Sequence, residues 1–233
     1  MVLTQIYGSY RFGSSSHLTE QQMRRFIRLF KRSTPAVLSV LDGRSSVAFD
    51  QIVGIGSVVV KNYTRGGLIR NLVKRRYLNL GKTRGQMEYE LLLKVKSLGI
   101  NAPDPVAYAY HGRLFYLAWL VTREIVQPLS LARMSLEDEK HAQKVMKSAV
   151  DQISRLIDND IYHVDLHPGN VVVDREDRVF LVDFDKGYVF RGKKEKLRKK
   201  YLARWERAVI KHRLPIMLSE IMFSGLRVNS DGR

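Results

Sequence analysis

The stretch His163-Val164-Asp165-Leu166-His167-Pro168-Gly169-Asn170, with the later run Val179-Phe180-Leu181-Val182-Asp183-Phe184-Asp185, decides the fold of this 233-residue chain. Three valines follow the first stretch, and the polar residues 174–178 separate them from the second apolar run. Two β-branched runs around a short polar segment predict a β-hairpin. Asn170 and Asp183 would then lie at neighbouring strand ends.

The residue types at these positions predict a phosphotransferase. Asp165 precedes Asn170 by five residues, and Asp183 follows Asn170 by thirteen, which matches the H-x-D-x-x-x-x-N and D-F-G elements of kinases. Asn170 and Asp183 offer the hard oxygen ligands that suit Mg²⁺, and Asp165 is the candidate base for the attacking hydroxyl. A lone H-x-D segment would indicate only a polar turn, but the joint spacing favours an ATP-dependent kinase.

A kinase also needs a lysine for the α- and β-phosphates and a helical glutamate that holds this lysine. Lys61 ends the apolar run that begins at Ser57, so we predict that it is the phosphate lysine. Glu88 lies in a segment with helical periodicity and is the preferred partner. Glu90 on the same segment is the alternative, and Lys61 could instead be an exposed residue at a strand end.

The loop that covers the phosphates is predicted at Asp42–Ser46, where Gly43, Ser45 and Ser46 could present backbone N–H groups to an anion. Gly54-Ile55-Gly56 lies too close to Lys61 for that role and is better interpreted as a hairpin turn. Because a full G-x-G-x-x-G motif is missing, a polar hairpin without a ligand is the alternative for residues 42–46.

Length and composition bound the fold. A chain of 233 residues with 45% hydrophobic content can bury the core of a two-lobed, protein-kinase-like α+β fold. No apolar run reaches the roughly 18 residues that a membrane-spanning helix needs, and the N-terminus lacks a signal-peptide pattern. The absence of cysteine excludes disulfides and cysteine metal sites. We therefore expect a cytoplasmic protein.

Strand patterns come first along the chain, and helical patterns follow. We predict an antiparallel-sheet lobe at residues 1–125, with a basic insertion at 65–84, and a mainly helical lobe at 126–233. Glu124 and Ile125 form the expected hinge, whose backbone would bind adenine. Thr19 and Gln22 occupy capping-box positions of a first helix, and Ser135 is expected to cap a long helix that ends near residue 158.

Further segments of the chain resemble the lipopolysaccharide kinase family, whose members have a protein-kinase-like fold. They are V-V-K-N-Y-T-R-G-G-L at 59–68, R-Y-L at 76–78, T-R at 83–84 and E-Y-E-L-L at 88–92. The resemblance covers roughly residues 40–210, and its catalytic part is shared with aminoglycoside and choline kinases.

The resemblance implies that the γ-phosphate of ATP passes to a sugar hydroxyl, with 3-deoxy-D-manno-octulosonic acid (Kdo) on lipid A as the acceptor. It also implies functional roles for Lys61, Glu88, Asp165, Asn170 and Asp183. His163 takes the place of the catalytic-loop histidine that packs beneath the site. His167 either approaches the γ-phosphate or packs against the following proline.

The formal charge of +17 predicts an attraction to polyanions. One basic cluster lies in the insertion, and the other covers residues 191–213, with eleven Lys or Arg against two Glu. In that segment Leu197, Tyr201, Trp205 and Val209 recur at a spacing of four, which is typical of a helix at a membrane interface. The alternative is that this stripe packs on the helical lobe. We expect contact with an anionic surface on the cytoplasmic face of the inner membrane.

Two other classes of function stay open on the sequence. The same catalytic residues could serve a protein kinase or a small-molecule kinase, although the segment after Gly187 lacks an activation loop that ends in A-P-E. A basic module that binds nucleic acid is the remote alternative, and no nucleic-acid-binding motif supports it. We predict a monomer with no nucleic-acid partner.

Overall fold

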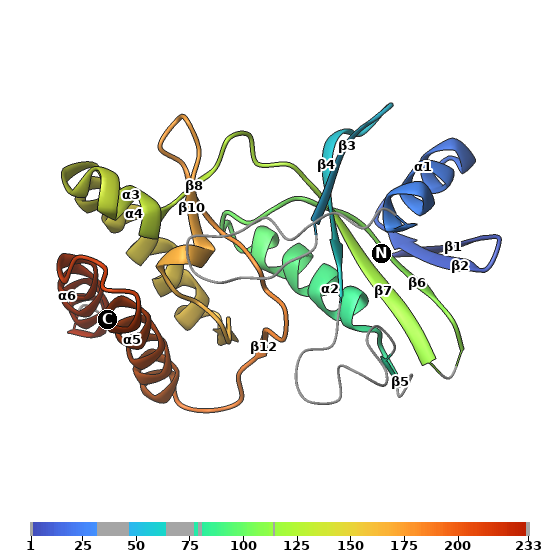
Figure 1. The fold of residues 1–233 in the computed structure, drawn as a ribbon. Helices are drawn as coiled ribbons and strands as arrows, with labels where there is room; N and C mark the ends of the chain where they lie inside the picture. The colour runs from blue at the N-terminus through green and yellow to red at the C-terminus, as the bar shows by residue number, and fades with distance from the viewer. Residues whose placement is uncertain (1, 32–46, 64–76, 79–80, 114, 232–233) are drawn as a thin grey trace. The chain divides into compact units, whose positions relative to one another are not determined.

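The computed structural model of the chain describes residues 2–31, 47–63, 77–78, 81–113 and 115–231 (Figure 1). They form two compact units. The first unit contains residues 2–31, 47–63, 77–78, 81–93, 104–113 and 115–124, and the second contains residues 94–103 and 125–231. The predicted α+β, kinase-like fold is confirmed, because an antiparallel sheet dominates the N-terminal region and helices dominate the C-terminal half. That the chain divides into domains at residue 125 stays a prediction.

The first unit is built on a seven-stranded antiparallel sheet among the described residues. Its strands are β1 (Leu3–Tyr7), β2 (Tyr10–Ser14), β3 (Val47–Ile52), β4 (Gly56–Asn62), β5 (Tyr77–Leu78), β6 (Pro105–His111) and β7 (Phe115–Arg123). They pair in the order β1-β2-β6-β7-β4-β3, and β5 also pairs with β7. Strand β4 therefore runs between β3 and β7, where Lys61 lies opposite Leu120.

The turn between β3 and β4 has the form that the sequence predicts. Gly54 and Gly56 both have positive φ angles, +78° and +101°, a conformation that glycine adopts without steric cost. The N–H of Ile55 donates to the carbonyl of Ile52 at 3.0 Å and closes the turn. The glycines thus serve the hairpin that carries Lys61.

The N-terminal hairpin of β1 and β2 was not predicted. Its two connecting residues include Gly8, with a φ of +58°, and β2 pairs with β6 so that the hairpin extends the sheet. Phe12 from β2 is 1% exposed and belongs to the core of the first unit. The sequence signal was present, because a glycine-containing two-residue link between strand-like runs favours a hairpin.

Helix α1 (Glu20–Lys31) covers this core. The predicted capping box is confirmed: the N–H of Thr19 donates to Gln22 Oε1 at 2.9 Å, and the N–H of Gln22 donates to Thr19 Oγ1 at 3.2 Å. The buried face of the helix includes Phe30, whose ring stacks on Trp119 at a centroid distance of 4.5 Å. Packing of an amphipathic helix on the sheet therefore holds β4 and β7 in place.

The segment with helical periodicity around Glu88 forms helix α2 (Arg84–Ser97). The hydroxyl of Thr83 accepts from the N–H of Gln86 at 3.3 Å, as the side chain of an N-cap residue does. Gly99 follows with a φ of +70°, as expected for a glycine after a helix. This helix carries both Glu88 and Glu90.

The second unit contains four α-helices and two small β-sheets among its described residues. The helices are α3 (Leu131–Glu137), α4 (Glu139–Asp158), α5 (Lys194–Lys211) and α6 (Met217–Asp231). The strands are β8 (Leu129–Ser130), β9 (Ile161–Tyr162), β10 (Val171–Val173), β11 (Val179–Leu181) and β12 (Tyr188–Val189), and η2 (Pro168–Asn170) is a 3-10 turn. Helix α6 packs against α4 and α5 (Figure 1). Within the described ranges, no helix has the length and apolar character required to cross a membrane.

The predicted start of the long helix is wrong. Ser135 is buried inside α3 and its hydroxyl donates to the carbonyl of Ala132 at 2.8 Å, so it caps no helix. Asp138 ends α3 and caps α4, because its carboxylate accepts from the N–H of His141 at 3.0 Å. Asp is among the strongest N-cap residues, and here it separates two helices that share one apolar periodicity. The buried residues of α4 form one apolar stripe and include Val145, Met146, Ala149, Val150, Ile153, Leu156 and Ile157.

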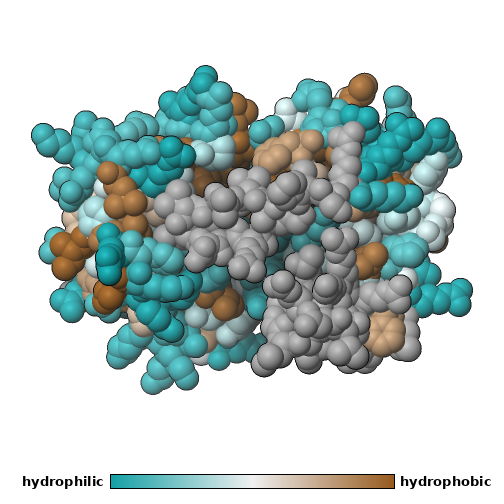
Figure 2. All heavy atoms as spheres, viewed as in Figure 1, coloured by the Kyte–Doolittle hydropathy of each residue, from teal (hydrophilic) through white to brown (hydrophobic). Residues whose placement is uncertain are grey.

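The apolar stripe of α5 faces the protein interior. Leu197, Tyr201 and Trp205 are at most 1% exposed, and the indole N–H of Trp205 donates to the carbonyl of Leu218 at 3.1 Å. Of the two interpretations of this stripe, packing on the helical part of the chain is therefore confirmed. The basic residues occupy the outer face of the helix, and hydrophilic side chains cover most of the described surface in the view of Figure 2.

Candidate active site

The loop between β9 and β10 carries most of the predicted catalytic residues. His163 is fully buried, its ring lies 4.5 Å from that of Phe184, and its Nε2 lies 2.9 Å from the carbonyl oxygen of Val182. Because a carbonyl only accepts, Nε2 carries the proton. Nδ1 then has no hydrogen-bond partner among the described residues, and burial lowers the pKa of His163. The neutral ring supports the site from beneath.

Asn170 and Asp183 lie at adjoining strand ends, as the hairpin predicts. The N–H of Val182 donates to the carbonyl of Asn170 at 2.9 Å, one residue beyond the pairing of β10 with β11. Val182 is thus held on both sides, by Asn170 through its N–H and by His163 through its carbonyl. Asp183 follows Val182 directly, so the same two contacts restrict its position.

The donor set of these two residues fits Mg²⁺. The side-chain amide of Asn170 donates from Nδ2 to the carbonyl of Asp165 at 2.9 Å, so its Oδ1 is the atom suited to a cation. Asp183 adds a carboxylate. The described residues contain no group of three or more His, Asp or Glu side chains that could hold a metal by themselves. A magnesium ion that is bound with a nucleotide needs fewer protein ligands, because phosphate oxygens supply the others.

Asp183 also has an uncommon backbone conformation. Its φ angle is +63°, in the left-handed region that a non-glycine residue adopts at a cost. Residues in such conformations gather at functional sites, where the surrounding structure fixes them. Here Phe184, which is fully buried, anchors the chain on the far side of Asp183.

Asp165, the predicted base, forms an ion pair that the sequence did not predict. Arg204 on α5 donates to Asp165 Oδ1 from Nε at 3.0 Å and from Nη2 at 2.5 Å. The side chain of Asp165 is 53% exposed, and that of Arg204 is 27% exposed. The candidate base is thus accessible and in contact with a residue 39 positions later in the chain.

His167 is mostly buried at the start of η2. Its Nδ1 accepts from the N–H of Gly169 at 3.0 Å, which makes His167 the N-cap of the turn that delivers Asn170. Burial, helped by the nearby guanidinium of Arg204 and opposed by the carboxylate of Asp165, lowers the pKa of His167 to about 4. His167 is therefore neutral near pH 7. Its capping contact favours the packing role over contact with a phosphate.

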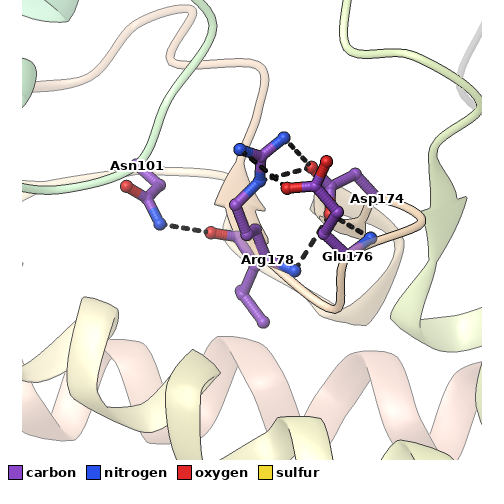
Figure 3. A network of polar contacts seen from close by, with 5 residues as sticks. Asn101, Asp174, Glu176 and Arg178 are labelled. Carbon is purple, nitrogen blue, oxygen red and sulfur yellow. Dashed lines mark hydrogen bonds and ion pairs between the residues drawn. The ribbon is translucent and has the colours of Figure 1, made fainter.

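A network of polar contacts closes the turn between β10 and β11 (Figure 3). Asp174 Oδ1 accepts from the N–H groups of Glu176 and Arg178 at 2.9 and 3.0 Å, and its Oδ2 accepts from Arg178 Nε at 2.7 Å. Burial raises the pKa of Asp174, but the hydrogen bonds from Arg178 and from the backbone outweigh it and hold the pKa below its ordinary value. Asn101 joins through its Nδ2, which donates to the carbonyl of Val179 at 3.1 Å. The hairpin with Asn170 and Asp183 at its open end is thus closed at its other end.

In the first unit, Lys61 pairs with Glu88 as predicted. Lys61 Nζ lies 3.1 Å from Glu88 Oε1 and 2.9 Å from Oε2, and the carboxylate is only 4% exposed. The hydroxyl of Tyr63 donates to the same carboxylate at 2.5 Å. A buried charge is tolerated when it is paired and hydrogen-bonded, and these contacts meet both conditions.

Glu90, the alternative partner, lies elsewhere. It accepts from Lys82 Nζ at 2.5 Å and from Gln86 Nε2 at 3.0 Å, and its side chain is 33% exposed. The two glutamates are two positions apart on α2 and so project in different directions. The register inferred from the apolar positions is therefore right.

The predicted hinge follows β7. The N–H of Glu124 donates to the carbonyl of Ser57 at 3.0 Å, so this donor already takes part in the pairing with β4. A base bound there would use the Glu124 carbonyl or the backbone of Ile125. Gly43, Ser45 and Ser46 lie outside the described residues, as does most of the basic insertion.

Three residues near the site were missed from the sequence: Tyr63, Tyr201 and Arg204. Tyr63 follows Lys61 by two positions, so the alternation of a strand puts both on one face. Arg204 lies three positions after Tyr201 and therefore on the same side of α5. That spacing was available in the sequence, but the burial of Tyr201 against the catalytic loop is a long-range contact.

Comparison with known proteins adds independent evidence. The sequence model of the lipopolysaccharide kinase (Kdo/WaaP) family matches residues 28–221. A 3-deoxy-D-manno-octulosonic acid kinase of Vibrio vulnificus strain YJ016 is 28% identical over 192 residues, which cover 81% of this chain and 80% of the relative. An enzyme of the same name from Xylella fastidiosa strain M23 is 32% identical over 176 residues, which cover 73% of this chain and 68% of the relative.

The matched region contains the described catalytic loop, the hairpin after it and the Lys61–Glu88 pair. The resemblance that the sequence motifs indicated is therefore confirmed. The chain belongs to the lipopolysaccharide kinase (Kdo/WaaP) family and is a phosphotransferase that acts on a sugar hydroxyl.

Proposed function

We propose that this kinase transfers the γ-phosphate of ATP to a hydroxyl of Kdo on a lipid A acceptor. The observation that carries the proposal is the backbone contact between Val182 and Asn170, which sets Asp183 beside Asn170 in a two-ligand arrangement suited to a metal–nucleotide complex. The names of the relatives, which are Kdo kinases, support the choice of acceptor.

The residues divide into three roles. Lys61, held by Glu88, would bind the α- and β-phosphates of ATP. Asn170 Oδ1 and the Asp183 carboxylate would hold Mg²⁺, which supplies charge neutralisation at the phosphates. Asp165 would orient the acceptor hydroxyl and take its proton, for which its exposed carboxylate is suited.

A sugar acceptor agrees with the short segment after the metal ligands. Asp183 is followed within five residues by β12, which pairs with β9 directly before the catalytic loop. This connection leaves little room for an activation loop, the element on which protein kinases depend for control. The brevity of the segment supports a carbohydrate acceptor over a protein.

We also propose that the enzyme works at the cytoplasmic face of the inner membrane. The acceptor would be anchored there by its lipid, and ATP is available on that side. The outer face of α5 exposes Lys193 and Lys196, and anionic lipids attract such residues by about 1 kcal/mol each near the surface. The attraction would be electrostatic, since the apolar side of the helix is buried.

Incubation of the purified chain with γ-labelled ATP and a panel of acceptors tests the proposal. The panel contains Kdo–lipid A, heptosylated core, an aminoglycoside and a generic protein substrate. We expect label in Kdo–lipid A. Chelation of Mg²⁺ should abolish this labelling. Label confined to the heptosylated core would reject Kdo as the acceptor, and label in protein would reject a sugar acceptor.

The variant Asp165→Asn is the control for the chemical step. It should bind ATP as the wild type does and lose activity by about a hundredfold or more, the usual contribution of a positioned base. Near-normal turnover would remove Asp165 from its proposed role.

A further inference from the structure

The ion pair between Asp165 and Arg204 uses only part of each side chain. Both donors of Arg204, Nε and Nη2, contact the same oxygen of Asp165, Oδ1. A carboxylate that is held by arginine alone usually accepts with both oxygens in a bidentate pair. In this arrangement Arg204 makes no contact with Oδ2, which stays available to a hydroxyl.

Not all N–H donors of the Arg204 guanidinium take part in the ion pair. Arginine carries five N–H groups, and the contacts of Arg204 with described residues occupy one side of the fork, formed by Nε and Nη2. Nη2 carries a second N–H that points away from Asp165, and this N–H and Nη1 form the other end, for which no hydrogen bond is seen in the described part of the chain. That planar end matches the geometry of a carboxylate or phosphate.

Arg204 is not required to attach α5 to the catalytic loop. Tyr201, one turn earlier and fully buried, already accepts from the N–H of His163 and donates to the carbonyl of Ile161, both at 2.8 Å. Leu197 and Trp205 bury the same side of the helix. The half-buried ion pair therefore adds little to an attachment that exists without it.

These observations assign Arg204 a role in binding the acceptor. We propose that Arg204 binds the carboxylate of an acidic sugar with the free end of its guanidinium, while the other side of the guanidinium keeps its hydrogen bonds to Asp165. This inference rests on the proposed function. The planar guanidinium then holds both the carboxylate of the sugar and the base, Asp165. This arrangement selects acidic over neutral sugars and decides which hydroxyl of the sugar meets Oδ2.

The acid group expected in the acceptor is the carboxylate of Kdo. The same fork could accept a phosphate of lipid A, so the test must separate the two anions. Kdo–lipid A and its carboxamide derivative at the sugar acid carry identical phosphates and differ in one charge. A difference in kcat/KM between them therefore reports on the carboxylate alone.

The experiment compares four proteins on these two acceptors: wild type, Arg204→Gln, Arg204→Lys and the control Arg207→Gln. Arg207 lies one turn further along α5 and is exposed, so its substitution removes the same charge from the same helix. We expect the wild type to prefer the acid by roughly tenfold to a hundredfold in kcat/KM, the range for a hydrogen-bonded charge. Arg204→Gln should abolish this preference through the KM for the acid and leave the KM for ATP unchanged.

Arg207→Gln should keep the full preference, and Arg204→Lys, which retains the charge without the planar fork, should keep a reduced one. A preference that persists in Arg204→Gln overturns the inference, whatever the absolute rate. Equal use of acid and carboxamide by the wild type overturns it as well and assigns any anion dependence to phosphate. In both cases Kdo phosphorylation, and with it the proposed function, would stand.

Discussion

The hydroxyl of Tyr201 accepts from the backbone N–H of His163 at 2.8 Å, so a side chain of α5 is hydrogen-bonded to the catalytic loop. The same hydroxyl donates to the carbonyl of Ile161 at 2.8 Å. Burial raises the pKa of Tyr201, which keeps it protonated and able to donate at every physiological pH. This phenol therefore joins α5 to the backbone on which the loop with Asp165 begins.

Replacement Tyr201→Phe should destabilise the protein by about 1–3 kcal/mol, because a buried N–H and a buried carbonyl lose their partner. Chemical denaturation gives the free energy of unfolding. Tyr162→Phe on β9 is the matched control, since no hydrogen bond of its hydroxyl is seen in the described structure. Similar losses for the two variants would contradict the bridging role of Tyr201.

The Lys61–Glu88 pair leads to a second prediction. Lys61→Ala and Glu88→Gln should each lower kcat by roughly a hundredfold or more, the usual cost of one lost charge-stabilising contact at a reacting group. The double variant should lose little beyond the larger single effect, because the two residues act as one unit. Glu90→Gln, on the same helix but paired with Lys82, should keep activity near that of the wild type. Additive losses in the double variant would show that Lys61 and Glu88 act independently of each other.

His167 predicts how stability depends on pH. Its pKa in the folded protein is about 4, against an ordinary value of 6.5, so the unfolded chain binds more protons between these values. The free energy of unfolding should therefore fall as the pH drops from about 6.5 towards 4, by roughly 2 kcal/mol at pH 5 from this residue. The variant His167→Asn keeps an acceptor for the N–H of Gly169 and cannot titrate, so it should lose that part of the pH dependence.

Denaturation curves at pH 7 and pH 5 measure the effect. The substitution His17→Asn, at an exposed position, controls for the removal of a surface histidine. The prediction is contradicted if the wild type and His167→Asn change equally in stability between the two pH values. His167 would then titrate alike in the folded and unfolded chains.

The outer face of α5 gives a fourth prediction. Lys194 donates to the carbonyl of Asp158 and Lys200 lies over the ring of Tyr162, so their replacement would disturb the fold. The double variant Lys193→Gln, Lys196→Gln changes exposed residues only. It should weaken binding to vesicles that contain anionic phospholipid by about 2 kcal/mol in low salt, and less as salt screens the attraction.

Co-sedimentation with vesicles at several salt concentrations measures this binding. The pair Lys144→Gln, Lys147→Gln removes the same charge from the exposed side of α4 and should bind like the wild type. Equal binding by both double variants would mean that net charge, and no particular face, draws the protein to the surface.

Local patterns predicted much of the fold because their causes are local. The Thr19–Gln22 capping box and the hairpin around Asp174 depend on neighbours within a few residues, and both were evident in the sequence. The Lys61–Glu88 pair joins residues that are far apart, yet the strand and helix patterns on each side sufficed to predict it.

The misses have long-range or competing causes. The burial of the α5 stripe depends on partners elsewhere in the second unit, so periodicity alone left its environment open. Arg204 reaches Asp165 across 39 residues, and nothing near either position indicates the contact. In the case of Ser135 two possible caps competed, and Asp138 prevailed because its carboxylate meets the N–H of His141.

The closed turn of β10 and β11 bears on the order in which the protein folds. The partners of Asp174 in Figure 3 lie within four residues of it, so closing this loop costs little chain entropy. The hairpin can form in microseconds, before the long-range packing of α4, α5 and α6. Arg178→Ala should therefore slow refolding more than it speeds unfolding in stopped-flow experiments. The half of the site that carries Asn170 and Asp183 would then be a nucleus on which the helices assemble.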